Sequence, residues 1–226
     1  MGWGDWIRGD AEIAPSLYAA DFRRLGPQVD ALLGAGCRIF HFDCGDGHFI
    51  PPVTIGPVVL RSIAPSIHQA GGILDCHLMV ADPVHHFAEF ASSGADSVTF
   101  HVEATDDPAG VGTAAHELGL AVGIVFNPET SPEAAAEFAV AAGAELVLCM
   151  SIVPGYSGQP FMVEALERVA RLRELLDLPI EVDGGVDEDN VVRLRAAGAS
   201  VLVAGSAVFA DPEPAAAYER LLAAAT

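Results

Sequence analysis

Two stretches of the sequence place imidazoles and carboxylates at the ends of apolar segments. "FHFDCGDGHFI" contains His41 and Asp43, and "ILDCHLMV" contains His77. Because successive side chains of a strand point to opposite faces, His41 and Asp43 share one face, and phenylalanines occupy the other. A later segment, "IEVDGGV", ends with Asp183. Imidazole nitrogens and carboxylate oxygens are ligands of divalent zinc, iron, manganese and cobalt, so these groups predict a divalent metal site if they meet.

For any single histidine, a second interpretation is a core imidazole that bonds to a nearby backbone group. Four candidate groups at the ends of three segments favour the metal site over this interpretation for His41 and His77. The core interpretation suits the remaining histidines better, and His85 and His86 are expected in solvent on a helix. The remaining histidines are His48, His68, His85, His86, His101 and His116.

The four groups can meet only if the segments before them converge. Short apolar segments alternate with longer alanine-rich segments of helical spacing, and several of the longer segments end in glycine. Strands are predicted at 12–16, 38–43, 74–79, 97–101, 121–126, 146–150, 180–183 and 201–204. Helices are predicted near 20–35, 57–70, 83–93, 109–118, 131–142, 161–176, 187–197 and 212–224.

Eight such pairs predict an α/β protein with a single (β/α)8 TIM barrel over residues 1–226. Residues 1–10 are expected to form a short N-terminal extension on the surface. An open doubly wound sheet is the alternative. In a barrel, the loops after the strands converge on one face, where His41, Asp43, His77 and Asp183 would meet.

Glycine-rich segments follow the last three predicted strands. "DGGV" and "AGSAVF" open helices at the positions where barrels commonly bind phosphate through backbone N–H groups. "PGYSGQPF" adds Gly155, Ser157 and Gly158 to the same wall. The alternative is that Gly184, Gly185 and Gly205 only permit tight turns.

Composition excludes several classes of function. The net charge of −20 disfavours a nucleic-acid partner, and no apolar run approaches the roughly 18 residues of a membrane helix. The N-terminus lacks the features of a secretory signal, and the four cysteines are scattered, so we expect a soluble cytoplasmic protein with reduced thiols. All eleven basic residues are arginines, which excludes lysine Schiff-base and pyridoxal phosphate chemistry.

The sequence resembles the ribulose-phosphate 3-epimerase family over nearly its whole length. The resemblance rests on ordered segments: "IAPSLYAADF", "HFDCGDGHFIPPVTIGP", "CHLMVADP", "VTFHVEA", "VGIVFNPETS", "MSIVPGYSGQPFM", "VDGGV" and "VAGSAVF". It implies a metal-dependent barrel enzyme that interconverts D-ribulose 5-phosphate and D-xylulose 5-phosphate by two-base proton transfer at C3. It also implies one divalent ion per chain, zinc before Fe(II), manganese or cobalt, and a homo-oligomer.

The resemblance assigns roles to individual residues. His41, Asp43, His77 and Asp183 correspond to metal ligands, and the two aspartates correspond to the acid/base pair. The expected substrate contacts are Ser16, His77, Met79, Met150, Gly155, Tyr156, Ser157, Gly158, Gly184, Gly185, Gly205 and Ser206.

Four positions depart from the family pattern. Gly45 replaces one of three methionines expected over the reacting face, Val153 replaces an acidic residue, Ser157 replaces a glycine, and Phe126 replaces a smaller aliphatic residue. Gly45 could admit a different ketose phosphate such as allulose 6-phosphate, or Phe126 could fill the space beside it. A barrel that binds a phosphosugar without turnover is the third alternative.

Overall fold

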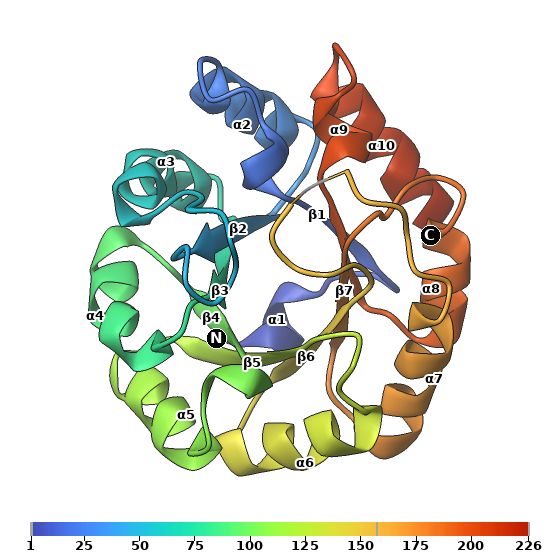
Figure 1. Cartoon of the computed structure of the whole chain (residues 1–226). Coiled ribbons are helices and arrows are strands. Elements are labelled where there is room, and N and C mark those ends of the chain that lie inside the picture. Colours follow the sequence, from blue (N-terminus) through green and yellow to red (C-terminus); the bar gives the residue numbers. More distant parts are fainter. Residues whose placement is uncertain (1, 157, 226) are drawn as a thin grey trace.

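The protein is described by a computed structural model that covers residues 2–156 and 158–225. Its eight strands form one parallel sheet in the order β1-β8-β7-β6-β5-β4-β3-β2, and a parallel bridge between Ser16 and His41 brings the two ends together (Figure 1). The strands are β1 (Glu12–Pro15), β2 (Ile39–Gly45), β3 (Ile73–Met79), β4 (Ser97–His101), β5 (Ala121–Phe126), β6 (Leu146–Met150), β7 (Ile180–Asp183) and β8 (Val201–Ala204). The predicted barrel is confirmed, and the open doubly wound sheet is wrong.

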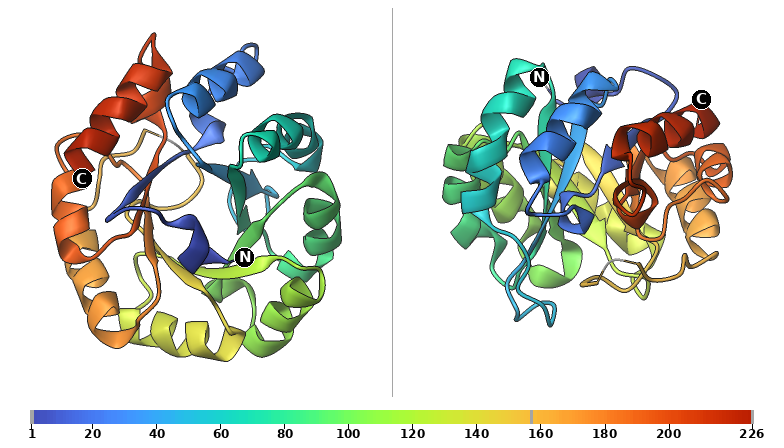
Figure 2. Two further views of the ribbon diagram at one scale, coloured as in Figure 1. Left: turned by 180° about the vertical axis from the view of Figure 1, so that it is seen from behind. Right: turned by 90° about the horizontal axis from the view of Figure 1, so that it is seen from above.

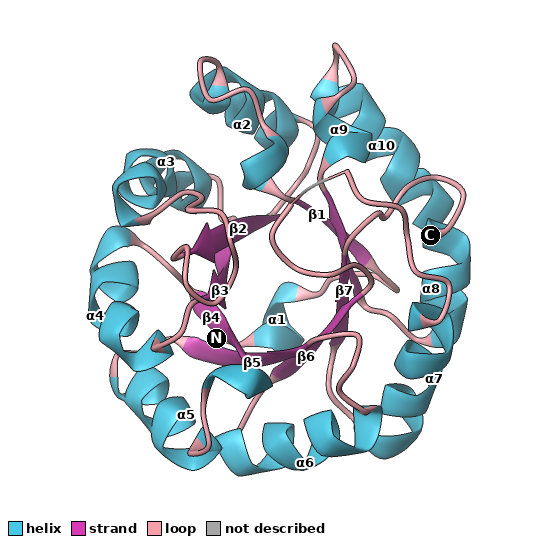
Figure 3. Ribbon diagram, viewed as in Figure 1, coloured by secondary structure: helices cyan, strands magenta, loops and turns pink. Residues whose placement is uncertain are grey.

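The helices form a ring around the strands (Figure 3). They are α2 (Leu25–Gly34), α3 (Pro57–Gln69), α4 (Pro83–Ser93), α5 (Pro108–Glu117), α6 (Pro132–Ala142), α7 (Ala165–Leu175), α8 (Val191–Ala197) and α10 (Pro214–Ala225), with short helices α1 (Trp3–Trp6) and α9 (Ser206–Phe209) and 3-10 turns η1 (Leu17–Ala19) and η2 (Val102–Ala104). Four of the long helices begin with a proline that follows a capping Asp, Ser or Gly, where the missing N–H costs nothing.

Several helices begin later than the sequence predicts. The residues that were expected in their first turns lie in the loops that follow the strands. The helix expected from residue 161 begins at Ala165, and the one expected from residue 187 begins at Val191. The four-residue helix α9 was not predicted. Within residues 2–156 and 158–225, every helix is too short or too polar to cross a membrane.

Because successive side chains of a strand point to opposite faces, the buried apolar residues form two separate clusters. Phe40, Phe42 and other outward residues pack against the helices, and inward residues such as Ile39 and Ile73 form a cluster inside the barrel. On β2, the inward series continues from Ile39 to His41 and Asp43. The apolar floor of the barrel therefore passes directly into a polar layer towards the carboxyl ends of the strands.

The N-terminal extension is exposed at Gly4, Asp5 and residues 8–10, as expected, but its short helix α1 closes the barrel from below. Trp3 in α1 is fully buried in the inner cluster, and Trp6 packs edge-on against it with ring centroids 5.3 Å apart. Viewed from behind, α1 crosses the opening of the barrel (Figure 2). The physical reason is that the opening exposes apolar side chains, and the two tryptophans cover them.

Replacement of Trp3 by alanine should therefore destabilise the whole barrel. Loss of a fully buried tryptophan ring typically costs about 3–5 kcal/mol of unfolding free energy. Urea denaturation followed by circular dichroism measures this loss. Val140→Ala, at a side chain that is 73% exposed, is the control and should change stability by less than about 0.5 kcal/mol. A Trp3→Ala protein as stable as the control variant would show that α1 is a surface appendage.

Candidate active site

The register of the strands brings the four predicted metal ligands to one level of the barrel. Asp43 pairs with His77 across β2 and β3, and Ser16, just after β1, bridges to His41. Asp183 ends β7 beside Met150 of β6. One ligand atom from each of His41, Asp43, His77 and Asp183 can be chosen so that all four lie within 4.8 Å of one another.

The two imidazoles face the two carboxylates with specific nitrogens. His41 Nε2 lies 3.2 Å from Asp43 Oδ1 and 4.0 Å from Asp183 Oδ2, whereas His77 Nδ1 lies 3.1 Å and 3.7 Å from the same atoms. Both histidines are fully buried.

The donor set fits a divalent cation. The Nε2 atom of His41 is buried and makes no hydrogen bond of acceptable geometry within the described residues. A buried polar atom without a partner is costly, and a cation between the four groups would satisfy it. Two nitrogens and two carboxylates are a ligand set that zinc and neighbouring divalent ions accept.

The environment drives the pKa values of the two carboxylates apart. Burial opposes ionisation of Asp43, but the adjacent His41 and His77 outweigh burial and hold the pKa of Asp43 well below its usual value. Burial and the negative charge of Asp43 raise the pKa of Asp183 to about 6. In the metal-free protein, Asp43 is therefore the ionised member and Asp183 is the member that titrates near neutrality, a separation typical of acid/base pairs.

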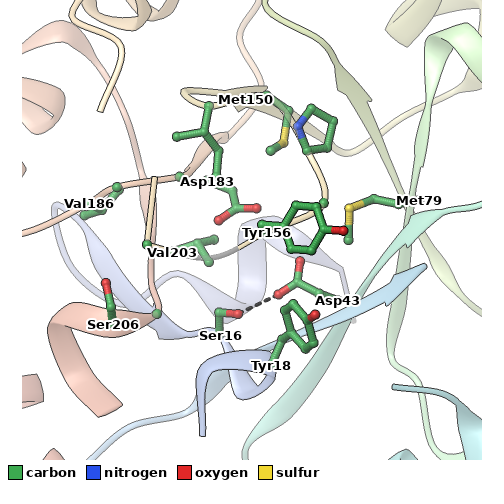
Figure 4. Close-up of a pocket in the computed structure, with 17 residues that line it drawn as sticks. Ser16, Tyr18, Asp43, Met79, Met150, Tyr156, Asp183, Val186, Val203 and Ser206 are labelled. Carbon is green, nitrogen blue, oxygen red and sulfur yellow. Dashed lines mark hydrogen bonds between the residues drawn. The ribbon is translucent and has the colours of Figure 1, made fainter. Parts of the chain in front are cut away.

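A pocket opens above these carboxylates, and twelve of the predicted residues line it. Figure 4 shows the Asp43 and Asp183 side chains pointing toward one another, and Ser16 Oγ donates a 2.5 Å hydrogen bond to Asp43 Oδ2. The predicted lining residues are Ser16, Asp43, Met79, Met150, Gly155, Tyr156, Gly158, Asp183, Gly184, Gly185, Gly205 and Ser206. His41 and His77 lie beneath the pocket, and Ser157 lies outside the described residues.

Five lining residues were not predicted. Tyr18, in the turn after β1, is the polar one, and Figure 4 shows its ring near Asp43 and Ser16. The other four are Ile152, Pro154, Val186 and Val203. Tyr18 could have been predicted from the sequence, because it lies two residues after Ser16 in a loop at the mouth of the barrel.

Two buried carboxylates beneath the site were also missed. Asp75 Oδ2 lies 2.8 Å from His41 Nδ1, and Asp75 Oδ1 accepts hydrogen bonds from Ser97 and Thr99. Glu181 Oε1 lies 3.3 Å from the same nitrogen of His41. Burial and the charge of Asp75 raise the pKa of Glu181 to about 8. Asp75 and Glu181 stand two residues before His77 and Asp183, so strand alternation could have identified both.

His101 is the third missed residue. His101 is fully buried, as the core interpretation expects, but within the described residues its two nitrogens contact the side chains of His77 and Glu103 instead of a backbone group. His85 is exposed on α4 as expected, and His86 is half-buried there. The core interpretation is wrong for His48, His68 and His116, which are exposed.

The glycine-rich loops form the wall beside Asp183. Gly185 has a φ of 64°, and a Cβ there would lie 2.8 Å from the backbone nitrogen of Phe161, so the close approach of these loops itself requires glycine. Gly205 differs, since its φ is −94° and its Cβ position is 3.3 Å from the Ala19 side chain. This contact is already tight, so packing against Ala19 favours glycine at position 205.

Comparison with known proteins decides the family. The sequence profile of the ribulose-phosphate 3 epimerase family matches residues 12–209. The ribulose-phosphate 3-epimerase of Synechocystis sp. is 40% identical over 207 residues, with 88% of each chain covered. That of Escherichia coli K12 is 38% identical, with 89% of this chain and 90% of the relative covered. This chain belongs to the ribulose-phosphate 3-epimerase family.

Solved structures agree on the fold. A structure described as 3-hexulose-6-phosphate synthase superimposes with a TM-score of 0.70 at 24% identity, covering 96% of this chain and 98% of that chain. At this identity the likeness concerns the barrel alone. The predicted membership of the ribulose-phosphate 3-epimerase family, and with it an epimerase-type enzyme, is confirmed.

The departures from the epimerase pattern have different structural consequences. A Cβ at Gly45 would lie 2.5 Å from Ile50 Cδ1, so Ile50 already occupies the space beside Gly45. The idea that Phe126 fills this space is wrong, because Phe126 belongs to the outer cluster and lies beneath the Arg168 guanidinium. Val153 is 53% exposed and does not line the pocket.

The donor set predicts close to one divalent ion per chain after purification without chelator. His77→Ala should remove much of this metal, because it deletes one of two nitrogen ligands while leaving the outer cluster intact. Elemental analysis together with protein quantification measures the ratio. His116→Ala, which removes an exposed imidazole, is the control and should keep the metal. Full occupancy in His77→Ala would contradict the proposed ligand set.

Proposed function

We propose that the protein is a divalent-metal-dependent epimerase that interconverts D-ribulose 5-phosphate and D-xylulose 5-phosphate at C3. The observation that supports this most strongly is the pair formed by Asp43 and Asp183. The two carboxylates come from different strands and face the same two imidazoles. Inversion of a carbon needs one group to remove a proton and another to return one from the opposite face.

Each residue has a role in this proposal. One aspartate accepts the C3 proton from one face and the other returns a proton to the opposite face, with the roles of Asp43 and Asp183 reversed for the opposite epimer. Ser16 holds one oxygen of Asp43 and leaves the other directed at His41 and His77. A divalent cation held by His41, Asp43, His77 and Asp183, zinc before Fe(II), manganese or cobalt, supplies stabilisation of the negative charge that develops next to C3.

The phosphate group of the substrate is assigned to the wall formed by Gly184, Gly185, Gly205 and Ser206. Among the described residues that line the pocket, none is an arginine, and the chain contains no lysine. Backbone N–H groups at the start of α9 have no partner within the helix and can bind an anion. This arrangement allows a protein of net charge −20 to bind a small phosphate ester.

An epimerase for a larger ketose phosphate such as allulose 6-phosphate is the second candidate. The sequence departures at Gly45 and Val153 are its support. The structure weakens that support, since Ile50 occupies the space beside Gly45, and Val153 is exposed and is not among the residues that line the pocket. A phosphosugar-binding barrel without turnover is the third candidate, and the presence of both aspartates disfavours it. Assembly into a homo-oligomer stays a prediction.

The roles of the two aspartates are tested by Asp43→Asn and Asp183→Asn. Each substitution preserves size but removes the basic oxygen, so epimerisation should fall by about 10²–10⁴-fold. A variant that retains its metal should still exchange the C3 proton from the remaining face for one epimer. Proton NMR in deuterated water should therefore show residual exchange that exceeds residual inversion. Inversion at the wild-type rate in either variant would refute the two-base mechanism.

The phosphate wall is tested by Gly205→Val. A side chain at this position should hold the anion away from the backbone and raise KM for the phosphorylated ketose, whereas metal content should not change. The control is Gly34→Val, because Gly34 is exposed in α2 and a Cβ there meets nothing within 4 Å. The unphosphorylated ketose should react poorly with wild type and lose turnover as well as affinity. Equal efficiency with and without the phosphate would contradict the assignment.

A further inference from the structure

The ring of His77 has a polar contact at each nitrogen. Its Nδ1 faces Asp43 Oδ1 at 3.1 Å, on the side where the four ligand atoms converge. Its Nε2 points away from that group and lies 2.9 Å from Nε2 of His101. The two rings lie edge to edge, with centroids 5.1 Å apart and their planes inclined by 28°. A cation held among the four groups therefore meets the Nδ1 atom of His77.

This contact restricts the positions of the protons. Two ring nitrogens 2.9 Å apart form a hydrogen bond only when one donates and the other accepts. A metal ligand must offer the lone pair of Nδ1, so neutral His77 must carry its proton on Nε2. His101 must then accept through Nε2 and carry its own proton on Nδ1.

Glu103 is placed to hold His101 in that form. His101 Nδ1 lies 3.3 Å from Glu103 Oε2, which accepts a hydrogen bond from the Nδ1–H group. The other oxygen of Glu103 accepts hydrogen bonds from the Asn127 backbone, at 2.9 Å, and from the Thr130 hydroxyl. His101 is fully buried, and the Phe49 ring packs against it with centroids 4.6 Å apart. The ring of His101 is therefore fixed by its neighbours as well as by its hydrogen bonds.

The other imidazole ligand has a different support. His41 Nδ1 contacts the carboxylate of Asp75 directly at 2.8 Å. On the Nε2 side of His77, the neutral imidazole of His101 lies between His77 and the Glu103 carboxylate. We propose that His101, held by Glu103, is a positioning residue that fixes His77 as an Nδ1 ligand of the divalent cation. The inference rests on the cation site of the proposed function.

Two substitutions test this role with zinc as the probe. His101→Phe keeps a flat ring but removes the acceptor, whereas His101→Gln keeps an oxygen that can accept from His77 and an amide that can donate to Glu103. Loss of such an outer partner typically weakens metal binding by about 10–100-fold. Competition with a chromogenic chelator should show this loss in His101→Phe and a smaller loss in His101→Gln. His116→Phe, at an exposed imidazole, is the control and should bind zinc as wild type does.

A spectroscopic measurement on the wild-type chain tests the geometry without any substitution. In protein labelled with ¹⁵N-histidine and loaded with ¹¹³Cd, the cadmium should couple directly to Nδ1 of His77, and a protected proton should remain on Nε2. Thermal unfolding of the metal-free variants separates a folding defect from a binding defect. If His101→Phe fails to fold, His101→Gln and the wild-type spectrum still decide the question.

The outcomes distinguish this inference from the proposed cation site. If wild type binds neither zinc nor cadmium, both are overturned. If wild type binds and His101→Phe binds equally tightly, or if cadmium couples directly to Nε2 of His77, the positioning role alone is overturned.

Discussion

The structure depends on the contact between the Asp43 carboxylate and the imidazoles of His41 and His77. An unpaired carboxylate charge inside the barrel would cost several kcal/mol, and the two polar rings beside Asp43 offset that cost in the metal-free protein. The register of β2 and β3 pairs Asp43 with His77, and alternation along β2 places His41 on the same inner face. The same contact keeps Asp43 ionised, whereas Asp183, beside that negative charge, has its pKa raised to about 6. Asymmetry between two similar carboxylates therefore follows from strand pairing.

The interior of the barrel consists of successive layers of side chains, and each layer has a different role. Apolar side chains and Trp3 close the floor, and the next layer contains Asp75, Glu181 and the inner edge of His41. The carboxylate pair and His77 stand above them, and the pocket opens at the ends of the strands. In the proposed function, backbone N–H groups of the loops at this end bind the phosphate, so no cationic side chain is needed beside the carboxylates. A lysine or arginine there would compete for Asp43 and Asp183.

The sequence predicted correctly those side-chain positions that follow from a repeat, namely strand alternation and the alternation of strands with helices. Strand alternation placed His41 with Asp43, and βα repetition predicted the barrel that brings Asp183 to them. It failed where tertiary packing decides. Residue type alone did not show that Trp3 enters the barrel, that Phe126 faces the helices, or that Ile50 fills the space beside Gly45. His101 was assigned to the core because it was considered singly, and only the pairing of β3 with β4 brings it near His77.

The central claim is that the metal-bound carboxylate pair epimerises a pentulose phosphate at C3. The most direct measurement incubates the wild-type protein with D-ribulose 5-phosphate, and in parallel with allulose 6-phosphate, in deuterated water. Proton NMR then follows deuterium entry at C3 together with formation of the epimer. We expect D-ribulose 5-phosphate to yield D-xylulose 5-phosphate with deuterium at C3, and allulose 6-phosphate to react far more slowly. Faster reaction of allulose 6-phosphate would assign the larger substrate, and absence of exchange in both would contradict the enzymatic account.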